Sequence, residues 1–126
     1  MKLGIMQPYF IPYVGYFQLI NLVDEFVIYD NIQFTKKGWI KRNRILLNNK
    51  EKTISLPLKK DSDFLDIRER YLAASWEIEK NKILNTIKIA YRKSPYFDEG
   101  LCLINSILDV SHNNLFDFIF ESIKII

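Results

Sequence analysis

The chain has 126 residues, of which 48% are hydrophobic and 26% charged, and its formal net charge is +3. This is the composition of one ordinary globular domain with enough apolar residues for a core, so disordered, collagen-like and disulfide-stabilised classes are excluded. A single cysteine cannot form an intramolecular bridge and no leader-like segment opens the sequence, so we expect a cytoplasmic protein. No apolar run reaches the roughly 18 residues of a membrane helix, so no membrane span is expected.

The N-terminal segment is predicted to form a β-loop-α-β unit. Residues 2–6 and 26–29 are short apolar runs rich in β-formers, and we expect both to be buried strands. The two prolines within residues 7–13 keep that segment extended, because each fixes φ and disfavours helix in the residue before it. A helix is predicted from just after Gly15 to near residue 24.

If these two strands are parallel, their carboxyl ends meet at one edge, where ligands usually bind in open α/β sheets. Gln7 and Tyr9 would leave the first strand there, and Asp30 and Gln33 the second. Tyr9 and Tyr13 can line such a crevice with a ring face and a hydroxyl, although packing against the sheet explains most aromatics of this loop equally well. Asp30 is the predicted general base, with helix capping or pairing to a lysine as the alternative.

Basic residues are concentrated in the next part of the chain. Residues 33–60 contain nine of the 18 lysines and arginines and one acid, Glu51, so this window carries +8 and the rest −5. Such an excess indicates an anionic partner, which could be a nucleic acid, an acidic lipid surface or a phosphorylated small molecule. A solvated edge hairpin, whose lysines prevent edge-to-edge pairing, explains the pattern without any ligand. As evidence for nucleic acid the pattern is weak, because no RNP, KH or zinc-finger motif accompanies it.

Within this window a β-hairpin is predicted, with strands at 44–47 and 53–58 around a polar turn at 48–51. Pro57 places the end of the second strand at an edge or bulge. The approach to the hairpin, residues 35–44, mixes lysines and arginines with Trp and Asn. Arginine forks bind phosphate or carboxylate, lysine adds charge and an indole can stack on a base or sugar, so this composition suits an anionic ligand.

The second half of the chain is predicted to be mainly helical. A short strand is favoured at 67–72, and a helix capped by Ser75 and ended by Pro95 should cover the sheet. Two more helices are predicted at 101–110 and 115–126. The last is apolar around most of its circumference, so either it forms a subunit interface or the chain is shorter than the domain of its ancestors. The expected fold class is α/β or α+β: a small sheet with the β-loop-α-β unit, a basic hairpin and C-terminal helices packed on it.

No metal or cofactor is expected. His112 is the only histidine and is predicted at the surface or at a helix cap, while Cys102 is predicted to be a small buried hydrophobe in a helix. One Cys and one His offer no spaced ligand cluster. The four glycines are scattered, so there is no phosphate-binding Gly-rich loop.

Three blocks follow one another closely: MQPYFIPYVGYFQLI at 6–20, DEFVIYDNIQF at 24–34 and GWIKRNRIL at 38–46. In this order and spacing they resemble the WbqC-like family of bacteria and archaea. Further matching segments are Ser55–Leu58, Trp76 and Tyr91–Phe97. The resemblance covers essentially the whole chain, 1–126, as a single domain shorter than the usual family domain.

The resemblance implies a role in surface-polysaccharide or related glycoconjugate biosynthesis, and transfer of an acyl or aminoacyl group to an amino sugar has been suggested for some members. Some relatives carry His where this chain has Met6, so a catalytic role for that His would alter or remove the chemistry here. Joined to the residue pattern, this predicts a nucleotide-sugar site in which Asp30 accepts a proton. The predicted binding residues are Gln7, Tyr9, Tyr13, Gln33, Lys37, Trp39, Arg42, Asn43 and Arg44.

Two other functions stay open. One is a non-catalytic sugar-nucleotide-binding or assembly module that needs a second copy or another protein, bound through the helix at 115–126. The weaker one is RNA binding through the basic hairpin, with a steep dependence on salt.

Overall fold

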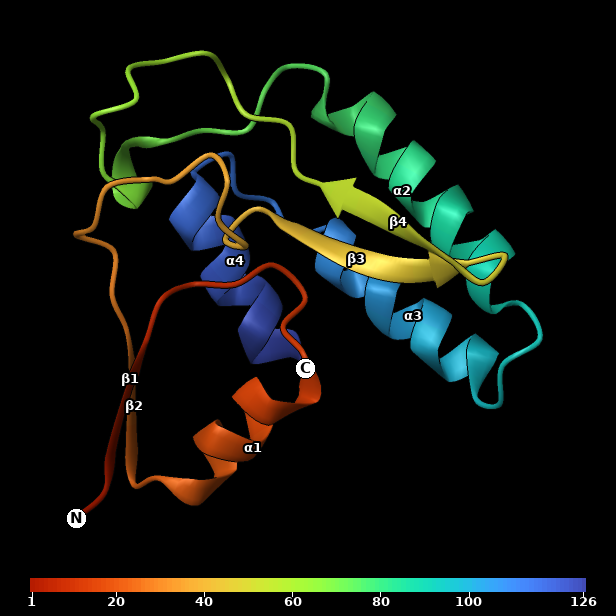
Figure 1. Ribbon diagram of the computed structural model, residues 1–126, viewed down its shortest axis with the longest axis horizontal. Coiled ribbons are helices and arrows are strands. Elements are labelled where there is room, and N and C mark those ends of the chain that lie inside the picture. The colour runs from red at the N-terminus through yellow and green to blue at the C-terminus, as the bar shows by residue number, and fades with distance from the viewer.

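The computed structural model describes residues 1–126 and has a mixed α/β fold, as predicted (Figure 1). None of its helices has the length and apolar character needed to cross a membrane. In chain order the elements are β1 (Leu3–Met6), α1 (Val14–Leu22), β2 (Glu25–Ile28), β3 (Arg42–Leu47), β4 (Lys50–Ser55), the 3-10 turn η1 (Ile67–Glu69), α2 (Trp76–Tyr91), α3 (Phe97–Leu108) and α4 (Leu115–Ile125).

The N-terminal unit has the predicted topology. β1 and β2 are parallel, with Gly4 opposite Phe26, and α1 connects them. Gly4 is required here, because an added Cβ would lie 2.9 Å from the ring of Phe26. The strands pair only with each other, so the protein has two separate two-stranded sheets and both edges of this one are free. Leu3, Ile5 and Val27 of this sheet are exposed to solvent, which contradicts the expectation that both strands are buried.

The second sheet is the predicted hairpin with a shorter turn. β3 and β4 are antiparallel, and Leu47 pairs directly with Lys50. Asn48 and Asn49 form the whole turn, with φ of 50° and 61°. Two positive φ angles are the signature of a type I′ turn, whose twist matches that of a hairpin, so the residues at 50 and 51 belong to the strand. β4 ends at Ser55 rather than at 58.

The strand predicted at 67–72 is mostly a different structure. Asp66 and Glu69 form a capping box, which starts the 3-10 turn η1 and replaces extended backbone. The rest of the segment is extended but bonds to the residues just before α4: the Leu72 N–H donates to the Asn113 carbonyl oxygen at 2.8 Å. Residues 71 and 72 form only isolated β-bridges, so the prediction of a strand at 67–72 is wrong.

The two middle helices differ from prediction at their ends. α2 follows Ser75 as expected, but the Ser75 backbone carbonyl accepts the first hydrogen bonds while its side chain makes none. α2 ends at Tyr91, before the proline predicted to stop it, because a turn at 91–94 closes with Ser94 N–H donating to Tyr91 O at 2.8 Å. Tyr96 then adopts a left-handed conformation, φ 59°, and α3 begins at residue 97 instead of 101.

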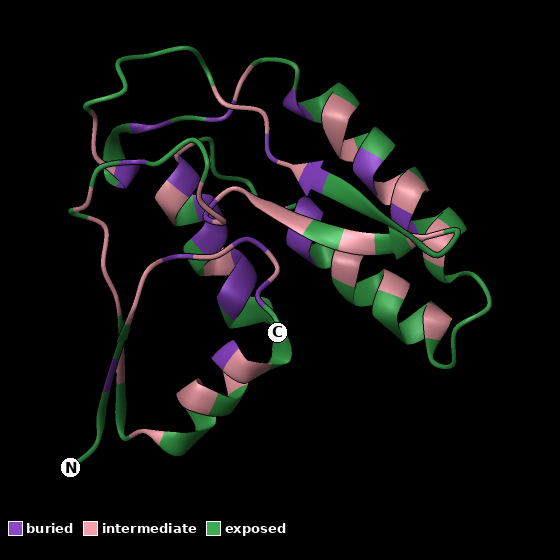
Figure 2. Cartoon of the chain, in the orientation of Figure 1, coloured by how far each residue is buried: buried purple, intermediate pink, exposed green.

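The core is built around α4, which lies in the middle of the fold in Figure 2. Phe118 is fully buried, and its ring centre lies 5.4 Å from that of Trp76 and 6.5 Å from that of Phe10. The apolar circumference of this helix is therefore buried largely within its own chain. Phe120, Ile125 and Ile126 remain partly exposed at its end. Cys102 is exposed on α3, contrary to expectation, since α3 buries Ile107 and Leu108 on another face.

Candidate functional site

The parallel pairing brings the predicted crevice segments to one edge of the first sheet. Gln7 and Tyr9 follow β1, and Asp30 follows β2. The last backbone bond between the strands runs from the Tyr29 N–H to the Met6 carbonyl oxygen at 3.2 Å. Gln7 and Asp30 therefore follow the two strands at the same end of the sheet, with Tyr29 rather than Asp30 directly opposite Gln7 in the register.

The loop over residues 7–13 is tied to the second sheet. Phe10 is fully buried, and its N–H donates to the Ile40 carbonyl oxygen at 2.9 Å. The Asn43 Nδ2 atom donates to the Ile11 carbonyl oxygen at 2.5 Å. Ile11 has a φ of 47°, a left-handed conformation that is costly for a β-branched residue. The Asn43 amide, predicted to contact a ligand, is thus engaged in holding a strained loop.

The tyrosines of this region have three different environments. Tyr13 is 64% exposed, whereas Tyr9 is half-buried. Burial raises the pKa of the Tyr9 hydroxyl and Tyr13 raises it further, while the positive charge of Arg44 lowers it, so Tyr9 lies within reach of the basic hairpin. Tyr16 is buried, its hydroxyl donates to the Gln7 carbonyl oxygen at 2.9 Å, and burial raises its pKa to about 12. Tyr16 was not predicted, and it fixes the position of Gln7.

Three of the predicted anion-binding residues form one cluster, which we call the Trp39 cluster. The guanidinium carbons of Arg42 and Arg44 lie 4.8 and 4.5 Å from the ring centre of Trp39. Arg42 also donates to two backbone carbonyl oxygens, that of Gly38 at 3.0 Å and that of Lys37 at 2.6 Å. These bonds close the turn before β3 and use two of the five N–H donors of the Arg42 guanidinium.

Arg44 is the more available arginine of the Trp39 cluster. Its Nη1 atom lies 2.8 Å from a carboxylate oxygen of Glu51 on β4, and its side chain is 47% exposed. An exposed ion pair of this kind contributes little stability, so an anionic ligand can compete with Glu51 for the guanidinium. Lys37 is exposed beside the cluster.

The segment after β2 bonds to another part of the chain. The Gln33 side-chain amide donates to the Asp63 carbonyl oxygen at 2.6 Å, and the Asp30 carbonyl oxygen accepts from the Arg68 N–H at 3.4 Å. These contacts run along residues 63–68 rather than to the Trp39 cluster. The two halves of the predicted site are therefore held by separate sets of hydrogen bonds.

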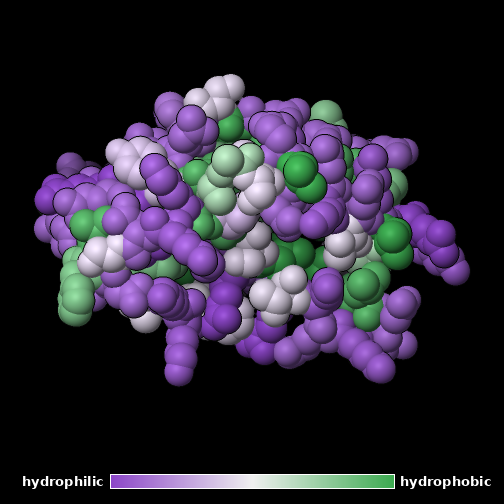
Figure 3. Space-filling model, turned by 90° about the horizontal axis from the view of Figure 1, so that it is seen from above, coloured by the Kyte–Doolittle hydropathy of each residue, from purple (hydrophilic) through white to green (hydrophobic).

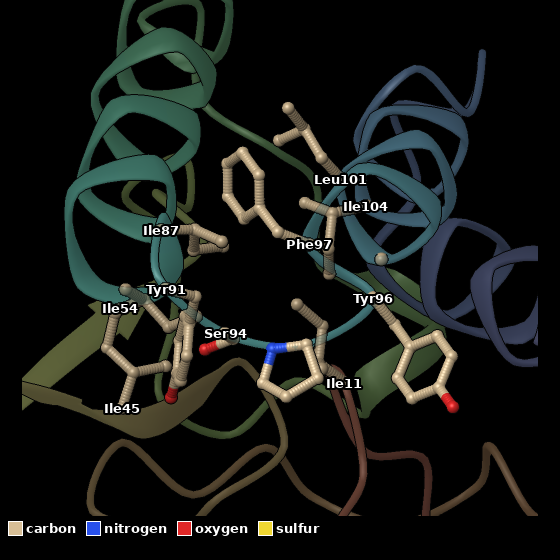
Figure 4. Close-up of a pocket in the computed structure, with 12 residues that line it drawn as sticks. Ile11, Ile45, Ile54, Ile87, Tyr91, Ser94, Tyr96, Phe97, Leu101 and Ile104 are labelled. Carbon is tan, nitrogen blue, oxygen red and sulfur yellow. The ribbon is translucent and has the colours of Figure 1, made fainter.

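None of the predicted site residues lines one of the five main surface hollows. One hollow is an apolar cavity of about 300 Å³ between the hairpin, α2 and α3 (Figure 4). Ile11 points into this cavity from the loop at 7–13, opposite Phe97 and Ile104 of α3, whereas the Tyr96 ring points away. The strained conformation of Ile11 thus places an apolar side chain in the cavity.

A second hollow, of about 560 Å³, is cationic, and one of its lining residues, Arg70, was not among the predicted site residues. Figure 3 shows one face of the molecule, on which hydrophilic side chains dominate the surface. Arg70 lies in the run predicted as an imperfect strand, and no sequence pattern marks an arginine that will be buried. We call this second hollow the Arg70 hollow. The charged residues that line it are Lys36, Lys41, Lys59, Lys60, Asp61, Asp63 and Arg70.

No group of three His, Cys, Asp or Glu side chains lies close enough together to hold a metal ion.

Comparison with known proteins relates the chain to one family. The model of the WbqC-like protein family matches residues 7–126. Among curated proteins, the uncharacterized protein Rv1507c of Mycobacterium tuberculosis is 47% identical over 58 residues, which are 46% of this chain and 25% of that protein. The match thus spans about a quarter of that relative's length. No solved structure matches.

Proposed function

Because the chain belongs to the WbqC-like protein family, we propose that it acts in glycoconjugate biosynthesis by binding a nucleotide-linked amino sugar. The observation that carries this proposal is the Trp39 cluster, which presents an exposed arginine and an indole beside the loop at 7–13. A sugar nucleotide offers the matching chemistry, namely a diphosphate for cations and a base or sugar face for an aromatic ring.

In this binding mode Arg44 and Lys37 contact the diphosphate and Trp39 contacts a ring of the ligand. Arg42 contributes charge and holds the turn that positions Lys37, through its bonds to the backbone. Asn43 acts mainly through the loop that it holds, because its amide is engaged with Ile11. Tyr9 and Tyr13 complete the binding surface from the loop, where Tyr9 is close enough to sense the charge of Arg44.

The proposed reaction is transfer of an acyl or aminoacyl group to the amine of the sugar. The amine nitrogen attacks the acyl carbonyl carbon, Asp30 accepts the amine proton, and the leaving group departs with the electron pair. Two observations support this version. Gln7 and Asp30 follow their strands at the same end of the sheet, and the apolar cavity next to the loop at 7–13 suits an acyl group.

A non-catalytic module that needs a second copy or another protein is the alternative. The exposed Phe120 and Ile126 favour it, because they line a largely apolar hollow between the end of α4 and α1, and Ile125 is exposed on the same helix. In this case the sugar nucleotide binds, but no transfer occurs without the partner.

The proposal is tested by titrating the chain with UDP- and dTDP-sugars, and with a short RNA, by calorimetry. We expect Arg42→Ala with Arg44→Ala to weaken sugar-nucleotide binding roughly tenfold or more, since each charge-assisted contact contributes this order of affinity. Lys50→Ala with Lys52→Ala removes two charges from the same hairpin and should leave binding unchanged, because neither lysine belongs to the cluster.

Two outcomes contradict the proposal: unchanged affinity in the arginine variant, or tight binding of RNA but not of sugar nucleotides. Arg44→Ala alone serves as a check on folding, because Arg42 then still closes its turn. Binding without transfer to any amino sugar favours the module that needs a partner.

A further inference from the structure

A buried arginine without a counter-ion lies at the Arg70 hollow. Arg70 is 4% exposed, and its Nε and Nη1 atoms are buried with no hydrogen-bond partner. Its one hydrogen bond runs from Nη2 to the Lys59 carbonyl oxygen at 3.4 Å, and its guanidinium carbon lies 4.8 Å from the ring centre of Phe34. A guanidinium stays protonated throughout the physiological pH range, so it cannot relieve its burial by losing a proton. Charges buried to this extent are normally paired.

The acids of the hollow do not supply the missing charge. An Asp63 carboxylate oxygen pairs with the Lys36 ammonium at 2.9 Å. Asp61 accepts a hydrogen bond from the Ser62 N–H at 2.8 Å. Neither carboxylate forms an ion pair with Arg70, so the chain leaves this guanidinium uncompensated.

The surroundings of Arg70 add further positive charge. Lys41, Lys59 and Lys60 line the same hollow. Burial lowers the pKa of Lys41, and the charges of Arg70, Arg42 and Lys36 lower it further. A hollow with five cationic side chains and two carboxylates, both already engaged, attracts anions from solution.

The backbone holds Arg70 in a fixed position. Its N–H donates to the Ile67 carbonyl oxygen at 3.1 Å within the turn of η1, and its carbonyl oxygen accepts from the Leu115 N–H at 2.9 Å at the start of α4. Ile67 and Leu115 are both fully buried. The guanidinium is therefore placed before any ligand arrives, which lowers the ordering cost of binding.

We propose that the Arg70 hollow binds a phosphate group, with Arg70 as its buried counter-charge and Lys41 and Lys59 as flexible contacts at the rim. A phosphate monoester or free phosphate carries close to two negative charges and several acceptor oxygens, which suits a site with several cations. Because the Nε and Nη1 atoms are enclosed, binding requires the side chains that cover them to move aside. This site goes beyond the proposed function, because it shares no lining residue with the Trp39 cluster.

The test is thermal unfolding in a phosphate-free buffer, with inorganic phosphate in one arm and a hexose 1-phosphate in the other. Either ligand at about a hundred times its Kd should raise Tm by about 5 °C or more by mass action. A shift with phosphate alone identifies the free ion, and a larger shift with the sugar phosphate identifies a phosphorylated small molecule. No shift in either arm overturns the proposal.

Arg70→Met should have two opposite effects. It removes an unpaired buried charge while keeping the volume of the side chain, so the ligand-free protein should melt at a higher temperature and its phosphate shift should disappear. Arg68→Met is the matched control, because Arg68 is exposed two residues away and pairs with Asp66, and it should keep the full shift. A phosphate shift in Arg70→Met equal to that of the unaltered chain contradicts the proposal.

Two further variants keep the test decisive. If Arg70→Met fails to fold, Lys41→Met should raise the Kd for phosphate roughly tenfold, and an unchanged Kd overturns the proposal. The variant with Arg42→Ala and Arg44→Ala should retain the phosphate shift while losing sugar-nucleotide binding. Failure of one proposal is thereby distinguished from failure of the other.

Discussion

Replacing Asn43 by Ala should destabilise the loop at 7–13 and with it the whole domain. The side-chain amide of Asn43 donates to the Ile11 carbonyl oxygen at 2.5 Å, in a part-buried position. Leaving a carbonyl of this kind unpaired costs about 1–3 kcal/mol. Relaxation of Ile11 from its left-handed conformation returns part of this, because that conformation costs about 1–2 kcal/mol. We therefore expect a net loss of about 1–2 kcal/mol of unfolding free energy.

The expected loss corresponds to a fall in Tm of about 4–8 °C for a domain of this size. Thermal and urea unfolding measure it, and hydrogen exchange should show faster opening of the amides at 9–13. Asn85→Ala is the control, because Asn85 is exposed on α2 and should change stability by no more than about 0.5 kcal/mol. A Tm for Asn43→Ala that matches the control would refute the assignment of this amide as the tie of the loop.

Two more predictions concern positions outside the Arg70 hollow. Gly100→Ala should raise the unfolding free energy by about 0.5–1 kcal/mol, because a helical glycine is entropically unfavourable and an added Cβ meets no atom within 4 Å. Urea unfolding measures this change, and an unchanged or lower free energy would contradict the prediction. For Tyr16, burial raises the folded-state pKa from 10.0 to about 12, so its neutral form stabilises the fold below pH 10 and this stability is lost as the pH rises from about 10 to about 12. Tyr16→Phe should weaken that decline in unfolding curves at pH 9 to 12, and an unaltered decline would assign it to other groups.

The local elements could be predicted because they depend on short-range patterns. The strands around residues 4 and 27, the helix after Ser75 and the final helix all appear where apolar spacing placed them. The boundaries failed where a single backbone conformation decided them. Two asparagines with positive φ shortened the hairpin turn, and left-handed Tyr96 started α3 early. Such conformations are set by the local turn and its packing, which hydrophobic periodicity does not report.

The site was predictable in part for the same reason. Trp39, Arg42 and Arg44 are near neighbours in sequence, so their clustering follows from a short turn and one strand. Arg70 was missed, because its burial depends on η1, on the start of α4 and on Phe34, which are far apart in the chain. Asn43 was predicted as a ligand contact, whereas its partner in the structure is a carbonyl of a loop more than thirty residues away.

Because the β1–β2 sheet pairs with no other strand, we expect its local stability to differ from that of the rest of the protein. This sheet packs on the core through one face only, and its two edges and its other, apolar face are free. We therefore expect it to open locally at lower free energy than the core around α4. Asp30 and Gln7 lie at the end of this weaker part, whereas the Trp39 cluster lies at the start of the separate β3–β4 hairpin. A ligand that spans both must supply the free energy of ordering the weaker part. Its affinity then depends on the stability of two strands that it touches only at their ends.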